Sequence, residues 1–308
     1  MVTRVGILGF SEGNGHPFSF SAIINGFSDT GMAASGWEGI HNYLCQRDAS
    51  EFGIGDLKVT HAWTQFSEIT KKLCDASKIP NAVSDPREML GNVDAIIIAR
   101  DDYESHLALA LPFLTDGLPV FVDKPLTLDP GELRTFRPFL ESGKLMSCSA
   151  MRYARELDLL RISIPGFGPI KLVRGAIVLS WEKYGIHLLE AIFGLMNPAP
   201  LYALSTGADH DSVVLGGDRE GILIQIDCLG AAPRTFSIEI FGKEQRVSAE
   251  ITDNFSMFRR ALWHFHDSMK TGTPAIEPAQ TILLMRILMA GRMAMKEKRK
   301  VMLDEIQI

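Results

Sequence analysis

Short apolar runs alternate with helical segments along the first 125 residues of this chain. VGIL from Val5, VDAIIIA from Val93 and PVFV before Asp123 are typical of parallel strands that are covered on both faces. Helix-forming segments such as FSEITKKLCDAS and YESHLALALPFLTDG lie between such runs. Regular alternation of strand and helix is typical of α/β domains with a parallel sheet. We predict an α/β domain with a doubly wound parallel sheet over residues 1–125.

The pattern changes after Thr127. Four strand-like segments follow one another without long helices between them: PIKLVRGAIVLSW, ALSTGADHDSVVLGG, REGILIQIDCL and RTFSIEIFGKEQRVSAEI. Consecutive strands of this kind indicate a mostly antiparallel, open sheet with helices, an α+β arrangement. We therefore predict a second domain over residues 126–308.

A long connection separates Phe27 from Leu57, where a doubly wound fold normally uses roughly 2–6 residues. The segment HNYLCQRDASEF within it is predicted to form a short helix. Insertions near the carboxyl edge of a sheet are often functional. A role in packing or oligomerisation is the open alternative for residues 28–56.

Bulk composition excludes several classes of partner. The net charge is −6 with a pI near 5.8 and no basic block, which argues against nucleic acid and anionic membranes. No apolar run reaches the roughly 18–20 residues of a membrane span. The four cysteines are widely separated, without a C-x-x-C pair, so we expect a reduced, cytoplasmic protein with small buried thiols.

The turn after the first strand, GFSEGNGHPFSF, lies where such folds bind a pyrophosphate, yet it lacks the G-x-G-x-x-G spacing. Gly9 ends the strand, and Asn14 tolerates the left-handed conformation. In the helical segment FSFSAIINGF, Ser19 or Ser21 is the expected N-cap. Pro17, just before that segment, would also suit a first helical turn. Together with the amides at the helix start, this modified loop is predicted to hold a diphosphate.

Lys124 follows a buried strand, at the edge of the sheet where ligands enter an open α/β fold. Pro125 ends that strand and fixes the local backbone. An ammonium at this place can hydrogen-bond a ribose or a substrate hydroxyl. The alternative is a lysine at a strand end that extends into solvent.

The stretch from Val93 to Asp129, with Asp123-Lys124-Pro125 near its end, resembles the Gfo/Idh/MocA family of sugar and inositol dehydrogenases, in which the tripeptide is usually Glu-Lys-Pro. MSCSAMRYARELDLL is similar to the family's strand and following Arg-Tyr segment. WEKYGIHLLEAIFG is similar to its D-x-G-x-H-x-x-D stretch, and the final helical segment also fits the family pattern. The resemblance covers nearly the whole chain.

This resemblance implies a Rossmann-type N-terminal domain and an NAD(P)-dependent oxidoreductase that transfers hydride at a secondary alcohol of a sugar, cyclitol or sugar-derived acid. Lys124 and His187 are implied as catalytic residues, the first for positioning and the second as acid and base. The expected cofactor-binding residues are Gly9, Phe10, Ser11, Gly13, Asn14, Gly15, His16, Arg100, His106, Asp123, Lys124 and Pro125. The expected substrate-binding residues are Lys124, Arg152, Tyr153, Lys183, Tyr184 and His187.

Lys183 stands at a position that is acidic in most of the family. It either lowers the basicity of His187 or binds an anionic group of the substrate, such as a carboxylate or phosphate. Alternatively, the alignment of this stretch with the family motif is shifted by one residue, and Glu182 supplies the acid. For Arg152 and Tyr153, contact with a substrate hydroxyl competes with a salt bridge at the domain interface.

The sequence leaves the choice between NAD and NADP open. The end of the strand LKVTHAW, near Trp63, Thr64 and Gln65, carries neither the acid that binds ribose hydroxyls nor an arginine for a 2′-phosphate. Two other functions remain open: a non-catalytic relative that acts as a binding protein, and a redox-neutral lyase or epimerase that uses bound NAD.

The expected partners are a small polyhydroxylated substrate and a second copy of the chain. The spare face of the C-terminal sheet favours a homodimer or homotetramer. No metal is expected: the H-x-H pair His264 and His266 points its two rings apart on a helix, and we find no other cluster with metal-ligand spacing.

Overall fold

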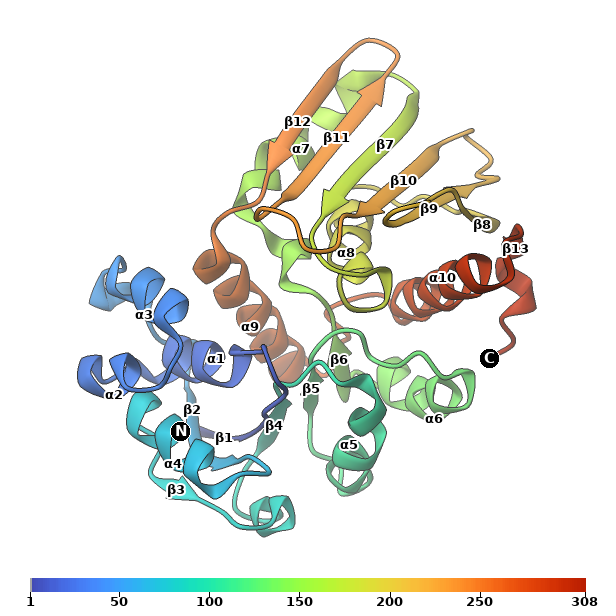
Figure 1. Ribbon diagram of the computed structural model, residues 1–308. Helices are drawn as coiled ribbons and strands as arrows, with labels where there is room; N and C mark the ends of the chain where they lie inside the picture. The colour runs from blue at the N-terminus through green and yellow to red at the C-terminus, as the bar shows by residue number, and fades with distance from the viewer. Residues whose placement is uncertain (1) are drawn as a thin grey trace. The chain divides into compact units, whose positions relative to one another are not determined.

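The structure is a computed structural model that describes residues 2–308. Its residues form two compact units, each with one sheet (Figure 1). The first unit comprises Met1–Leu126, Thr135–Ser147 and Phe258–Pro278. The second comprises Thr127–Arg134, Cys148–Met257 and Ala279–Ile308.

The first unit is built on a six-stranded parallel sheet in the order β3-β2-β1-β4-β5-β6. This order is that of the doubly wound dinucleotide-binding fold, in which the chain runs outward from the centre in both directions. The strands are β1 (Thr3–Leu8), β2 (Leu57–Trp63), β3 (Asn81–Ala82), β4 (Ala95–Ile98), β5 (Val120–Val122) and β6 (Leu145–Ser147).

Central strands β4 and β5 are buried along their whole length, as their uninterrupted apolar sequence predicts. Phe121 of β5 contacts the aromatic rings of Phe20 and Phe265, which come from helices before and long after it in the chain. The helices with residues in this unit are α1 (His16–Asn25), α2 (Asp29–Ala33), α3 (Glu38–Cys45), α4 (Ser67–Ser77), α5 (His106–Thr115), α6 (Pro130–Glu141) and α9 (Asn254–Thr271).

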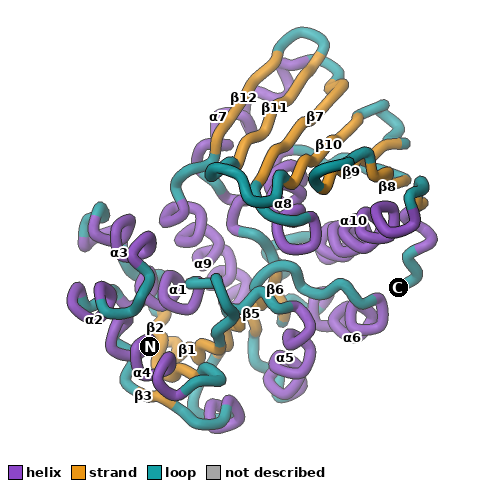
Figure 2. Tube along the Cα trace, in the orientation of Figure 1, coloured by secondary structure: helices purple, strands orange, loops and turns teal. Residues whose placement is uncertain are grey.

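The second unit contains a seven-stranded sheet in the order β12-β11-β7-β10-β9-β8-β13, whose strands lie side by side in Figure 2. Only the β7–β10 pair is parallel among its strand pairs in the described chain. The strands are β7 (Ile170–Ile177), β8 (Tyr202–Ser205), β9 (Asp211–Gly216), β10 (Leu223–Cys228), β11 (Phe236–Gly242), β12 (Arg246–Glu250) and β13 (Val301–Met302).

Helices cover one face of this sheet. Leu188 of α8 packs so closely on β7 that a methyl group at Gly175 would lie 2.7 Å from it. Trp181 is fully buried, and its Nε1 donates to the carbonyl of Leu288 on α10. The helices of this unit are α7 (Asp158–Ser163), α8 (Ile186–Leu195) and α10 (Pro278–Glu297), which begins at the last residue of the first unit.

The predicted fold class is confirmed: a doubly wound parallel sheet is followed by a mostly antiparallel sheet with helices. The predicted N-cap of α1, Ser19 or Ser21, was wrong. The helix begins at His16 with Gly15 as its N-cap and Pro17 in its first turn, so Ser19 and Ser21 lie buried inside it. The wrong N-cap came from hydroxyl preference alone, whereas the observed N-cap Gly15 lies four residues before Ser19.

The predicted domain boundary between residues 125 and 126 stays a prediction. The units themselves are discontinuous, since the first one includes Thr135–Ser147 and Phe258–Pro278. The physical reasons are local: β6 pairs with β5, and Phe265 of α9 packs on Phe121. None of the described helices is long and apolar enough to cross a lipid bilayer.

Candidate functional site

The loops that follow β1 and β4 leave the sheet at the point where strand order reverses. In open α/β sheets this switch point, at the carboxyl ends of the strands, is where ligands bind. The loop after β1 spans residues 9–15, and the turn after β4 contains Arg100, Asp101 and Asp102. These two segments therefore define the first candidate site.

The loop after β1 has the backbone geometry of a phosphate cradle despite its altered glycine spacing. Gly9 lies so close to Ala99 that a methyl group there would come 3.1 Å from the Ala99 carbonyl oxygen and would overlap Pro17. Gly13 has a φ of +79° and no heavy atom within 4 Å of where its Cβ would be. The N-cap Gly15 has no side chain to cap α1, and Asn14 Oδ1 accepts from the backbone N–H of His16 at 2.8 Å. The loop thus presents open backbone beside a helix N-terminus, and this arrangement fits a diphosphate.

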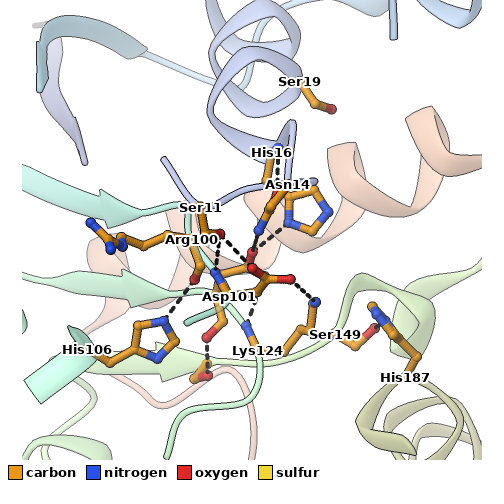
Figure 3. A network of polar contacts seen from close by, with 12 residues as sticks. Ser11, Asn14, His16, Ser19, Arg100, Asp101, His106, Lys124, Ser149 and His187 are labelled. Carbon is orange, nitrogen blue, oxygen red and sulfur yellow. Dashed lines mark hydrogen bonds and ion pairs between the residues drawn. The ribbon is translucent and has the colours of Figure 1, made fainter. Parts of the chain in front are cut away.

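Two polar side chains of this loop, and that of the first residue of α1, bond to acids that follow β4 and β5 (Figure 3). Ser11 Oγ donates to Asp101 Oδ1 at 2.5 Å, and Asn14 Nδ2 donates to Asp123 Oδ2 at 3.0 Å. His16 Nδ1 lies 2.6 Å from the same Asp123 oxygen. The loop is therefore fixed to the ends of β4 and β5 by its own side chains.

Lys124 lies two residues beyond the end of β5 and is only 3% exposed. Its Nζ is 3.5 Å from Asp101 Oδ2, so that Asp101 connects the lysine to Ser11 of the loop (Figure 3). Pro125 follows through a cis peptide bond. The structure thus brings Ser11, Asn14, His16, Asp123 and Lys124 together, as expected for residues of one site.

Sequence reasoning missed Asp101. A usable signal existed, because Asp101 comes three residues after the last residue of β4, at the same edge of the sheet as Lys124. The site holds two carboxylates, Asp101 and Asp123, beside one ammonium. Ribose and substrate hydroxyls can donate to such carboxylates.

Asp123 is fully buried and yet stays ionised. Burial raises the pKa of this carboxyl, but the nearby His16 ring, the charge of Lys124 and the bond from Asn14 outweigh burial. The pKa of Asp123 consequently lies well below its usual range. A group with a lowered folded-state pKa stabilises the fold above its unfolded pKa, and this contribution is lost as the pH falls toward the folded value.

Asp123→Asn is expected to destabilise the protein by about 1.5–3 kcal/mol at pH 7, since the bonds from His16 and Asn14 lose their charged acceptor. The deficit should shrink below pH ~4, where the unfolded wild-type carboxyl takes up its proton first. Thermal unfolding between pH 7 and pH 3 measures both effects. Asp116→Asn, at the exposed end of α5, is the control and should change little at any pH. A deficit that grows as the pH falls would contradict this account.

Three other expected cofactor residues are engaged in local bonds. Arg100 forms a two-point ion pair with Asp102, at 2.6 and 2.5 Å. His106 is fully buried, and its ring nitrogens lie 2.8 Å from the Arg100 carbonyl and 3.0 Å from that of Leu126. The backbone of Phe10 is hydrogen-bonded to the side chain of Gln65. These residues support the turn after β4 and the loop.

Gln65 follows β2, where a ribose-binding acid often stands. Its amide pairs with the Phe10 backbone: Phe10 N donates to Gln65 Oε1 at 3.1 Å, and Gln65 Nε2 donates to Phe10 O at 2.6 Å. The side chain at this position therefore fixes the loop. Sequence reasoning noted Gln65 only for its lack of charge.

The second unit contains the other expected catalytic residue. His187 is half-buried in the first turn of α8, and its Nδ1 lies 2.6 Å from Ser149 Oγ (Figure 3). The Tyr184 ring contacts the imidazole edge-on at a centroid distance of 4.9 Å. When Nδ1–H donates to Ser149 Oγ, Nε2 keeps its lone pair and can accept a proton. Ser149 is a second residue that sequence reasoning did not identify.

Arg152 and Tyr153, both expected to bind substrate, lie in a short 3-10 turn (Ala150–Tyr153) against α8. Arg152 Nε donates to Glu190 Oε2 at 2.5 Å, and the two side chains are 9% and 1% exposed. Burial raises the pKa of Glu190 and that of the Tyr153 hydroxyl. The arginine is therefore paired within its own unit, although its Nη2 has no hydrogen-bond partner among the described residues.

Lys183 and Tyr184 lie in a π-helical turn, Trp181–Gly185, that precedes α8. The Lys183 side chain is exposed, whereas Tyr184 and Glu182 are half-buried. Glu182 lines a cavity of about 890 Å³ within the second unit. The cavity's charged lining includes Asp211, Arg292, Lys296 and Glu297. Lys183 and Glu182 thus have different surroundings although they are adjacent in sequence.

Comparison with known proteins gives a family for part of the chain. Residues 30–146 match the family model described as an oxidoreductase family with an NAD-binding Rossmann fold. This is the Gfo/Idh/MocA family that the sequence motifs resemble, and the match supports the resemblance over residues 30–146. The matched segment begins after the altered loop and α1.

Solved structures of similar fold extend over the whole chain. A myo-inositol 2-dehydrogenase from Lactobacillus plantarum has a TM-score of 0.78 at 14% identity, covering 98% of this chain and 99% of that one. A probable dehydrogenase from Thermotoga maritima has a TM-score of 0.75 at 16% identity, covering 98% of this chain and 99% of that one. A scyllo-inositol dehydrogenase from Lactobacillus casei, solved with NAD(H) and scyllo-inositol, has a TM-score of 0.75 at 13% identity. The match covers 99% of this chain and 100% of that one. At such identities the likeness establishes the fold alone, over nearly the whole length of the chain. No curated protein sequence matches this chain.

Proposed function

We propose that this protein is an NAD(P)-dependent oxidoreductase for a secondary alcohol of a sugar, cyclitol or sugar-derived acid, with the bound dinucleotide supplying the hydride acceptor. The observation that carries this proposal is the buried Lys124 at the carboxyl end of β5, joined through Asp101 to the open loop after β1. The matched family is one of oxidoreductases with an NAD-binding fold. Several structures of similar fold are named as inositol dehydrogenases.

Each residue has a role that its surroundings support. The loop amides at Gly13 and Gly15 and the start of α1 hold the diphosphate, and Lys124 donates to a hydroxyl of the ligand. His187 Nε2 takes the hydroxyl proton as the alcohol is oxidised, while Ser149 fixes the ring. Lys183 and Tyr184 contribute polar contacts to the substrate. Residues 1–125 thus provide the cofactor functions and residues 126–308 the substrate functions.

Gly13→Ala is expected to weaken dinucleotide binding, because an L-residue at a φ of +79° costs about 1–2 kcal/mol and distorts the loop. Titration of the wild type and the variant with NADH and NADPH, followed by nicotinamide fluorescence, measures this loss. Gly91→Ala is the matched control. Gly91 has a φ of +76° in a turn before β4, with no atom within 4 Å of its Cβ position.

The control variant should lose stability to a similar degree without losing dinucleotide affinity. If neither dinucleotide binds the wild type at millimolar concentration, the proposed oxidoreductase function is wrong. A panel of polyols and sugar acids, tested with whichever dinucleotide binds, then defines the substrate. A net change of nicotinamide absorbance separates a dehydrogenase from a redox-neutral enzyme.

We further propose that the protein works as a homodimer or homotetramer in a reducing cytoplasm. In support, none of the four cysteines, all of which lie in the described chain, forms a disulfide, and Cys74, Cys148 and Cys228 are buried. Leu223 on β10 is an exposed apolar residue of the C-terminal sheet. Light scattering coupled to size-exclusion chromatography measures the oligomeric state.

A further inference from the structure

Three potential metal ligands meet in the long connection between α1 and β2. His41 Nε2 lies 2.7 Å from Asp29 Oδ1, and Cys45 Sγ lies 3.8 Å from the same oxygen. The ligand atoms of Asp29, His41 and Cys45 all lie within 4.8 Å of one another. The three side chains are exposed or half-buried, so an ion can reach them from solvent.

Local structure explains how the three residues meet. His41 and Cys45 are four residues apart on α3 and therefore share one face of that helix. Asp29 is the first residue of α2, after Ser28, whose side chain caps that helix. The Phe27 ring packs edge-on against the His41 ring at 6.2 Å and limits its rotation. The ligands thus come from two helices, and the imidazole is held in place.

The ion pair between His41 and Asp29 does not account for Cys45. Cys45 Sγ and His41 Nε2 both lie against the same Asp29 oxygen, at 3.8 and 2.7 Å, so the three ligand atoms converge on one place. A divalent cation at that place can bind the carboxylate, the thiolate and the imidazole at once. The thiol proton then leaves to solvent as the metal–sulfur bond forms.

We propose that Asp29, His41 and Cys45 form a zinc site. Thiolate, imidazole and carboxylate are all ligands of Zn²⁺, at about 2.3, 2.0 and 2.0–2.2 Å, and a water molecule completes the tetrahedron. Ligand atoms of such a tetrahedron lie roughly 3–4 Å apart, so a small inward movement of the side chains is enough. The site is independent of the dinucleotide and of the residues assigned to the proposed function.

The metal joins α2 to α3 and fixes the segment between them. This segment ends at Trp37, whose ring packs near Phe10 and would lie 2.7 Å from a methyl group at Gly15. Ile40 on α3 contacts the same glycine position. Zinc therefore stabilises the part of the insertion that covers the loop after β1.

Titration with Co²⁺ under reducing conditions, followed by absorbance, tests the proposal without cofactor or substrate. We expect one equivalent to bind with a thiolate-to-cobalt band in the near ultraviolet, and competition by Zn²⁺ to remove the band. Cys45→Ser should abolish the band, and His41→Ala should weaken binding at least tenfold. Cys74→Ser is the control, because that thiol is buried on α4 and its loss should leave the band unchanged.

Thermal unfolding gives a second readout. Zn²⁺ should raise the melting temperature of the wild type and of Cys74→Ser but not that of Cys45→Ser. The proposal is overturned if Co²⁺ gives no thiolate band at stoichiometric concentration, or if the band persists in Cys45→Ser. Failure here leaves dinucleotide binding as measured above, so the two proposals fail separately.

Discussion

His187→Ala is expected to lower kcat by about 10²–10⁴-fold, the usual contribution of a general acid or base. The reason is geometric: Nδ1 lies 2.6 Å from Ser149 Oγ, and Nε2 is then the ring atom that can exchange a proton. Steady-state kinetics with the polyol found by the substrate panel measures the loss. Dinucleotide affinity should stay at the wild-type value, because His187 belongs to the second unit.

Ser149→Ala separates chemistry from positioning. It keeps the imidazole but removes the oxygen that orients it, so a smaller fall in kcat is expected together with a shifted pH profile. Wild-type kcat in His187→Ala would remove the assignment of this residue as acid and base. A loss confined to KM would instead indicate a binding role.

Glu190→Ala is expected to destabilise the second unit by about 3–5 kcal/mol, because it leaves the Arg152 charge buried without its partner. For a unit of this size the melting temperature should fall by roughly 6–20 °C. Differential scanning calorimetry resolves the transition. Glu190→Gln, which keeps a hydrogen-bond acceptor for Arg152 Nε, should lose less.

Two further variants define the origin of this effect. Replacing the pair together, by Arg152→Met with Glu190→Leu, removes both charges and should recover much of the lost stability. Lys71→Ala disrupts the exposed pair with Asp75 and should leave the melting temperature unchanged. A wild-type melting temperature in Glu190→Ala would show that the buried ion pair contributes nothing to the stability of the second unit.

Much of the first unit could be predicted from sequence because its central strands are buried on both faces. The run AIII of β4 and the run VFV of β5 are fully buried, and each is followed by a turn at the ligand edge of the sheet. Lys124 was identified on this basis. The partner Asp101 was not, since no local pattern tells which carboxylate beyond β4 points toward a lysine beyond β5.

Tertiary contacts account for the other differences between the sequence-based expectations and the structure. Arg152 looked available for substrate, but its pairing with Glu190 joins a 3-10 turn to a helix that lies 38 residues further along the chain. The cluster on α3 did have a signal, since HNYLC places histidine and cysteine at helical spacing. Asp29 joins them only through the packing of α2, which no periodicity predicts.

The discontinuity of the first unit has a consequence for synthesis. Phe265, which packs on Phe121 of β5, is made long after β6 has left the ribosome. At roughly 5–20 residues per second, on the order of ten seconds pass between translation of Ser147 and of Phe258. During this time the nascent sheet lacks part of its aromatic cover. A ribosome-bound intermediate that exposes Phe121 should therefore recruit chaperones, and release of the chain from them should require residues 258–278.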